Sequence, residues 1–172
     1  LALYSCVSTE GIEDALCVDA LPMYRVAIDD NILARRIDSH SAQDYNSNTK
    51  HTRASHNFIQ YNIRTLGKHT SRKIMHTLFS VSHAHFMSLQ ETRARKSGVF
   101  QMDGSIVVAS AAENGQYGCE IWLSTSKPVA HYDDNKVFIA PHNITILHAD
   151  PRLLIISLVV RTLKILIVSA HA

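Results

Sequence analysis

The chain of 172 residues is long enough for one ordinary domain and too short for two large ones. Its apolar share of 46% and charged share of 19% are close to globular averages, which excludes collagen-like, coiled-coil and wholly disordered classes. Seventeen Lys and Arg against fifteen Asp and Glu leave a net charge of +2, so total charge alone does not argue for a nucleic-acid or membrane partner.

The first 37 residues carry no motif that indicates a function. They combine a predicted short helix at 10–20 with an apolar run at 23–28. No basic residue precedes the first apolar ones and acidic residues follow soon after, so we do not expect a signal peptide. The three cysteines are odd in number and widely spaced, which disfavours a disulfide framework or a zinc site and indicates a reducing intracellular compartment, the nucleus included.

Residues 38–57 are almost entirely polar and predict a flexible linker between the N-terminal segment, residues 1–37, and a domain at residues 58–172. The linker lies within a basic block, residues 31–97, that holds eleven Lys and Arg against three Asp and Glu. This local charge of +8 suits a polyanionic partner, and a solvated basic linker explains much of it equally well.

From residue 58 the apolar pattern predicts a sheet-rich α/β domain. A strand at 58–62, a helix at 70–82 and a strand at 84–90 form a parallel βαβ unit, which is right-handed almost without exception. The apolar stripe of the helix is expected to contain Ile74 and Val81, with Leu78 between them. Further strands are predicted at 105–110, 118–124, 136–140, 143–148, 153–160 and 163–170.

The apolar stretch at 153–170 approaches membrane-spanning length. Arg161 and Lys164 lie at its centre, where each would cost roughly 2.5 to 3.5 kcal/mol in a bilayer. Two adjacent buried strands around a polar turn therefore explain the stretch better, and we expect no membrane partner.

Each strand of the βαβ unit is followed by a polar side chain, Asn62 after the first and Glu91 after the second. The carboxyl ends of parallel strands meet at one sheet edge about 4.8 Å apart, so an amide and a carboxylate can converge there. One carboxylate beside an amide oxygen suits Mg²⁺, which keeps several waters. Alternatively, Glu91 caps a turn or pairs with Arg93 or Arg95, and Asn62 makes an ordinary turn contact.

The motifs YNIRTL at 61–66 and SLQETR at 88–93 resemble the opening motifs of the endonuclease/exonuclease/phosphatase superfamily, and most closely its retrotransposon and apurinic-site endonucleases. GQYGCEIWLS at 115–124 and the strand pair ending in His171 are also similar to that family. The resemblance covers residues 58–172. It implies the N-terminal part of a two-sheet α/β sandwich, with Asn62 and His171 as catalytic residues and Glu91 as the metal ligand.

The family's later motifs, an Asp-x-Asn with the proposed base and a closing Ser-Asp-His, would lie beyond residue 172. Asp133 and Asn135 offer a superficial Asp-x-Asn, but they precede His171 in a polar loop and are interpreted as turn residues. The resemblance therefore implies a truncated domain with little activity of its own. It also implies a sheet face at 153–168 left partly uncovered, through which the chain could self-associate.

The function implied by the resemblance is hydrolysis of DNA phosphodiester bonds with Mg²⁺, or Mn²⁺ in its place. Contacts to the nucleic-acid backbone are expected from four basic residues near the proposed metal ligand: Arg64, Arg93, Arg95 and Lys96. Two alternatives remain open, a phosphatase of the same superfamily acting on a lipid or inositol phosphate, and a non-catalytic relic or interaction module.

Overall fold

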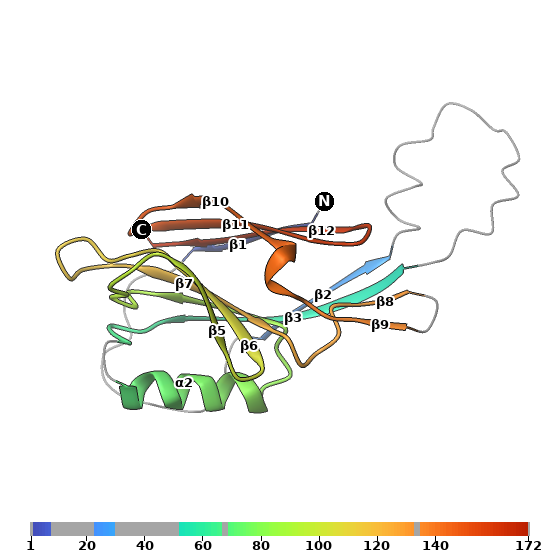
Figure 1. Ribbon diagram of the computed structural model, residues 1–172, viewed down its shortest axis with the longest axis horizontal. Helices are drawn as coiled ribbons and strands as arrows, with labels where there is room; N and C mark the ends of the chain where they lie inside the picture. Colours follow the sequence, from blue (N-terminus) through green and yellow to red (C-terminus); the bar gives the residue numbers. More distant parts are fainter. Residues whose placement is uncertain (1, 8–22, 30–51, 67–68, 133–134, 172) are drawn as a thin grey trace, which may run out of the picture.

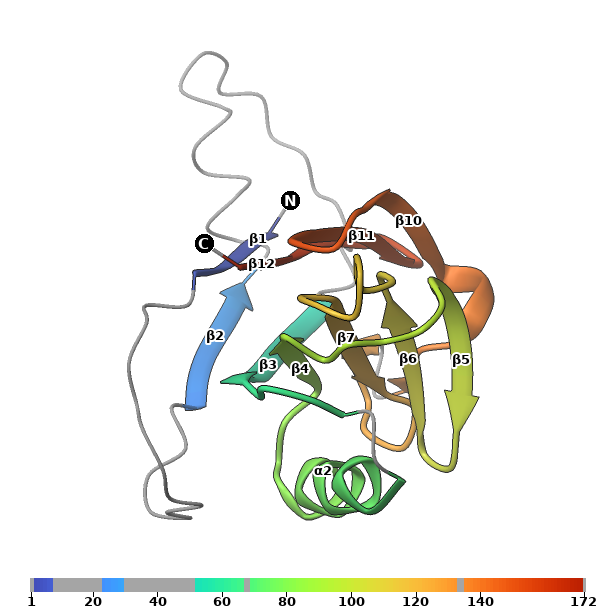
Figure 2. The ribbon, with the colours of Figure 1, turned by 90° about the vertical axis from the view of Figure 1, so that its left-hand side faces the viewer.

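Two β-sheets pack face to face, and one helix covers the outer face of the larger sheet (Figure 1). The computed structural model describes five stretches of the chain, residues 2–7, 23–29, 52–66, 69–132 and 135–171. Seen from the side, the small sheet, the large sheet and the helix follow one another as three layers (Figure 2). The α/β class expected from the sequence is confirmed, with strand predominating over helix.

The larger sheet is built around the βαβ unit that the sequence predicts. Its strands, in spatial order, are β5 (Gly98–Met102), β6 (Ser105–Ala109), β7 (Cys119–Ser124), β4 (Phe86–Gln90), β3 (Thr52–Asn62), β8 (Ala130–Tyr132) and β9 (Asn135–Val137), with β2 (Met23–Asp29) paired to β3. Strands β3 and β4 run parallel, so that Asn62 lies opposite Gln90 at their shared carboxyl edge. Helix α2 (His69–Val81) connects them, which confirms the predicted strand, helix and strand.

Helix α2 presents only part of the expected stripe to the sheet, since Leu78 is the one member that packs against the core. Ile74 and Val81 are 47% and 70% exposed, whereas Met75 and Phe79 are buried. Phe79 packs edge-on against Trp122, with ring centres 6.1 Å apart. Arg72 lies on the same helical face and donates two hydrogen bonds to Glu120 of the sheet. The apolar pattern alone could not include this ion pair.

The predicted linker extends too far, because residues 52–57 form the first half of β3. Their polar composition suggested a loop, but Ala54 and His56 are buried in the sheet, where a neighbouring carbonyl satisfies the imidazole. Residues 38–51 lie outside the described part of the chain, as does the predicted helix at 10–20. The domain boundary at residue 58 is also too late, because β2 and β1 (Ala2–Val7) pair with β3 and β12.

The small sheet is formed by strands from both ends of the chain. Its order is β1, β12 (Leu163–Ala170), β11 (Leu153–Val160) and β10 (Ile144–Ala149), and the short 3-10 helix η1 (Pro141–Asn143) leads into it. Strands β11 and β12 form an antiparallel hairpin, as predicted for the apolar stretch at 153–170. Among the described residues, no helix is long and apolar enough to cross a membrane.

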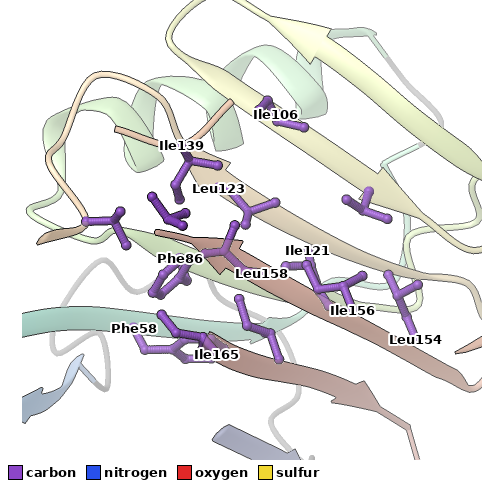
Figure 3. Close-up of a cluster of buried hydrophobic side chains, with 14 of the residues drawn as sticks. Phe58, Phe86, Ile106, Ile121, Leu123, Ile139, Leu154, Ile156, Leu158 and Ile165 are labelled. Carbon is purple, nitrogen blue, oxygen red and sulfur yellow. The ribbon is translucent and has the colours of Figure 1, made fainter. Parts of the chain in front are cut away.

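The main core lies between the two sheets (Figure 3). Leu154, Ile156 and Leu158 alternate inward from β11 and meet Phe58 and Phe86 of the larger sheet. The larger sheet thus fully covers the inner face of the hairpin, and the expectation that residues 153–168 lack their partner is wrong for these side chains. The outward-facing residues of β11 are partly exposed, Val159 by 40%, so self-association through this face stays a prediction.

Candidate active site

The candidate site lies at the carboxyl edge of the parallel pair β3–β4. Pairing continues past the strand ends through a bond from Ile63 N to Gln90 O, at 3.0 Å. The next residue, Glu91, has φ +55°, a left-handed conformation that non-glycine residues rarely adopt. Such strain persists where surrounding contacts enforce it and often accompanies function. Here it turns the chain out of β4 directly at the shared edge.

Asn62, Glu91 and His171 converge at this edge. The Asn62 amide donates to Glu91 Oε1 at 3.2 Å, and His171 Nε2 lies 2.9 Å from the same oxygen. The three residues come from β3, from the end of β4 and from the end of β12, so that both sheets contribute. A bond from Ser88 Oγ to Ser169 Oγ, at 2.7 Å, ties β4 to β12 just behind the site.

This arrangement replaces the alternative in which Glu91 pairs with a neighbouring arginine. Within the described part of the chain, the side-chain partners of Glu91 are Asn62 and His171. The Glu91 and His171 side chains are 25% and 10% exposed, so the carboxylate is shielded on one side and open to solvent on the other. No described residue bonds to Glu91 Oε2, which leaves this oxygen accessible to a ligand.

Tyr117 and Arg152 extend the site, and neither residue was expected there from the sequence. The Tyr117 ring centre lies 5.7 Å from that of His171. Arg152 Nη2 donates to the Tyr117 hydroxyl at 2.6 Å, and its guanidinium carbon lies 4.1 Å from the ring centre. A cation held against an aromatic ring beside an imidazole is suited to an anionic ligand.

Gly118 is the sequence signal that could have located Tyr117. Its φ is +89°, and a Cβ there would lie 3.2 Å from Arg93 N and from Thr92 Oγ1. The bare glycine lets the loop approach the chain after Glu91, where Thr92 N bonds to Gly118 O and Arg93 N to Tyr117 O. The Tyr-Gly pair therefore sets the distance between Tyr117 and the site.

Several buried polar atoms around Glu91 have no hydrogen-bond partner among the described residues. They are both amide atoms of Gln90, Thr92 Oγ1 and His171 Nδ1. A buried polar group without a partner costs about 1–3 kcal/mol, and proteins usually satisfy such groups with protein atoms, water or a ligand. These four atoms, from three residues, surround one carboxylate, so the edge has polar atoms available to water or a small polar ligand.

The donor set decides which metal this site can hold. The described residues contain no group of three or more His, Cys, Asp or Glu that could bind a metal together, so they offer no closed zinc-type site. Glu91 and the Asn62 amide provide oxygen donors, one of them charged. Mg²⁺ accepts such a set because it retains most of its waters, and Mn²⁺ accepts the same ligands. The residues present therefore fit either ion.

The four predicted backbone-binding cations lie on the two loops that leave β3 and β4 at this edge. Arg64 follows Asn62, and the others, Arg93, Arg95 and Lys96, follow Glu91. All four are exposed. Asn135, in contrast, begins β9 near the opposite end of β3, and Asp133 lies outside the described residues. The Asp-x-Asn of that loop is therefore not part of the site.

His83 and His85, which alternate in the sequence, do not form a metal site with other described residues. His85 Nδ1 accepts a hydrogen bond from Asn57 N at 3.1 Å. Burial, together with the charges of His56 and Lys127, lowers the pKa of His85 to about 4. Burial also lowers the pKa of His56, whose Nε2 donates to Val129 O at 2.7 Å. His56 and His85 are therefore neutral structural residues.

No protein-family model matches the chain, and no curated protein matches its sequence.

Proposed function

We propose that the edge around Glu91 binds Mg²⁺ or Mn²⁺ together with a phosphodiester of DNA, and that the chain carries the metal-binding part of an endonuclease site of the endonuclease/exonuclease/phosphatase type. The observation that carries this proposal is the meeting of Asn62 and His171 on one oxygen of Glu91. These residues are separated from Glu91 by 29 and 80 positions in the sequence. Ordinary turn chemistry does not bring such distant groups together.

The chain's own residues orient the carboxylate. Asn62 and His171 both hold Glu91 Oε1, so that Oε2 is directed to the ligand. A divalent cation at this carboxylate would neutralise charge on the phosphate oxygens and stabilise the leaving oxyanion. Arg152, stacked on Tyr117, supplies a further positive charge beside His171 for the same phosphate.

The basic loops favour a nucleic acid over a small phosphorylated molecule. A single phosphate would be bound by Arg152 and the metal, whereas Arg64, Arg93 and Lys96 extend the positive surface along the edge. A continuous phosphate backbone would use cations spread in this way. An inositol phosphate or lipid headgroup, the substrate of a phosphatase, would need them gathered around one point.

A non-catalytic interaction module remains the second candidate, because the described site contains one carboxylate and no second acid beside it. General acid–base groups are worth about 10² to 10⁴ in rate, so a site without a water-activating residue should turn over slowly. We therefore expect residues 1–172 to bind the metal and to nick plasmid DNA weakly or not at all.

Titration with Mn²⁺, followed by electron paramagnetic resonance of the free ion and competition with Mg²⁺, tests the proposal. The intact chain should bind Mn²⁺, and Glu91→Gln should abolish binding because it removes the charge but keeps the shape. Glu113→Gln, at an exposed loop position, is the matched control and should bind as the parent does. Absence of binding at millimolar ion, or equal binding by Glu91→Gln, would reject the proposal.

A further inference from the structure

A concave surface lies between α2 and the β5–β6 hairpin. It has a volume of about 500 Å³. Its rim is basic and is formed by Arg72, Arg95 and Lys96. Its walls are apolar and are formed by Phe100, Met102 and Ala109. This volume is within the range of sites that bind small organic ligands, about 300 to 1,000 Å³. We call this surface the hairpin cleft.

The cleft exists because α2 covers only part of the larger sheet. The helix packs over Met87, Leu89 and Trp122 of the central strands β4 and β7. At the β5–β6 edge one pair of opposed sheet positions carries small residues, since Gly98 lies directly opposite Ala109. With no bulk at either position, a hollow remains beside the helix.

The rim of the hairpin cleft carries two uncompensated positive charges. Arg72 donates two hydrogen bonds to Glu120, at 2.6 and 3.1 Å, and the Glu120 side chain is only 1% exposed. The one acid of the cleft is thereby neutralised. Arg95 and Lys96 are exposed and have no ion pair with any residue that the structure describes. An anionic ligand would complete this set of charges.

Phe100 supplies the other recognition element. It lies in the middle of β5 and is 44% exposed, which is unusual for a large aromatic side chain in a strand. Its ring leans over Gly98, where an added Cβ would lie 3.6 Å from Cζ. An exposed ring beside two free cations is the combination that binds single-stranded nucleic acid, with bases stacking on the ring and phosphates on the cations.

We propose that the hairpin cleft binds one unpaired nucleotide of the substrate, with its base stacked on Phe100 and its phosphate held by Arg95 and Lys96. The cleft is adjacent to the candidate active site, since the loop that begins at Glu91 reaches it within five residues. The inference rests on the proposed function for its substrate class. The base must be unpaired, because in a duplex the base faces are covered by their neighbours.

Fluorescence anisotropy of a short labelled single-stranded DNA with the full chain tests the stacking contact. Phe100→Ala should weaken binding by at least about fivefold with an unchanged salt dependence, since stacking on an aromatic ring is worth that much per base. Phe100→Tyr should retain affinity. Phe138→Ala is the matched control, because Phe138 is 43% exposed but lies outside the cleft, and it should bind as the parent does.

The phosphate contact has a separate signature. Lys96→Ala should reduce the slope of log K against log salt by about 0.7, the value expected when one phosphate contact of a single strand is lost. Lys136→Ala, an exposed position on β9, should leave the slope unchanged. The inference is overturned if Phe100→Ala and Phe138→Ala have the same affinity for the single strand. It is also overturned if Phe100→Ala weakens the binding of a fully paired duplex, or of a polyglutamate peptide, as much as it weakens the binding of the single strand.

Failure of the inference can be told apart from failure of the proposed function. If Glu91-dependent Mn²⁺ binding is intact but Phe100→Ala has no effect on DNA binding, the hairpin cleft is wrong and the metal site stands. If no metal binds but Phe100→Ala still weakens single-strand binding, the cleft is supported and the endonuclease proposal falls.

Discussion

Near the start of β4, buried and half-buried polar side chains are bonded to backbone atoms, whereas at its end several buried polar atoms have no partner in the described part of the chain. His56 and His85 bond to Val129 O and Asn57 N, and Lys127 Nζ donates to the carbonyls of Phe79, Ser82 and Ala84. At the other end, Gln90, Thr92 and His171 carry buried atoms with no partner among the described residues. The first cluster is bonded within the protein, whereas the second is the one at which we propose that a ligand binds.

The largest effect is expected from Lys127, which caps the carboxyl end of α2. Lys127→Ala removes charge-assisted hydrogen bonds to three carbonyls and should lower the free energy of unfolding by about 2–4 kcal/mol. Lys136→Ala, at an exposed position, should change it by less than about 0.5 kcal/mol. Urea unfolding measures both, and equal small losses would mean that the cap is not structural.

Acid should act on the same cluster. The pKa of His85 is lowered to about 4 by burial and the charges of His56 and Lys127, whereas the unfolded chain titrates near 6.5. The unfolded state therefore binds more protons in this interval, and the free energy of unfolding should fall as the pH drops from about 6.5 towards 4. A proton on Nδ1 would also break the bond from Asn57 N.

Urea midpoints measured at pH 7 and pH 5 test this effect. His85→Gln should flatten the dependence on pH, while His131→Gln, at an exposed strand position, should leave it as in the parent. A midpoint that stays constant between the two pH values would contradict the assignment of His85 as a neutral structural residue.

The sequence predicts the βαβ unit, the β11–β12 hairpin and the meeting of Asn62 with Glu91, because each follows from local periodicity and from the geometry of parallel strands. His171 was expected from the family resemblance alone. It reaches Glu91 only when the small sheet packs on the larger one, which is a property of the whole fold.

Other features depend on partners that are remote in the sequence. Strand β3 begins within a polar stretch because β2 pairs with it, and the buried face of α2 includes Arg72, which bonds to the remote residue Glu120. Strand β5 was not expected, since its middle residues are exposed and do not alternate.

A gain in stability is expected at the other cluster. Gln90 is fully buried with both amide atoms unpaired among the described residues, and Met has nearly the same shape without the polar atoms. Gln90→Met should therefore raise the free energy of unfolding by about 1 kcal/mol. Mn²⁺ binding should weaken, because the polar surroundings of Glu91 are reduced. A fall in stability would mean that the amide is satisfied in solution and belongs with the structural cluster.

Two asparagines on β3 allow the smallest and sharpest comparison. Asn57 donates through its side chain to His83 O at 2.9 Å, while Asn62, five residues on, donates to Glu91. Asn57→Ala should lower the free energy of unfolding by about 0.5–1 kcal/mol and leave Mn²⁺ binding unchanged. Asn62→Ala, at an exposed strand end, should change the free energy of unfolding by less than about 0.5 kcal/mol. It should nevertheless weaken Mn²⁺ binding, because Glu91 loses one of its two orienting donors. If both variants weakened Mn²⁺ binding equally, the two ends of β3 would not have the separate roles assigned to them. The loss of binding would then follow from a general loss of stability and not from the orientation of Glu91.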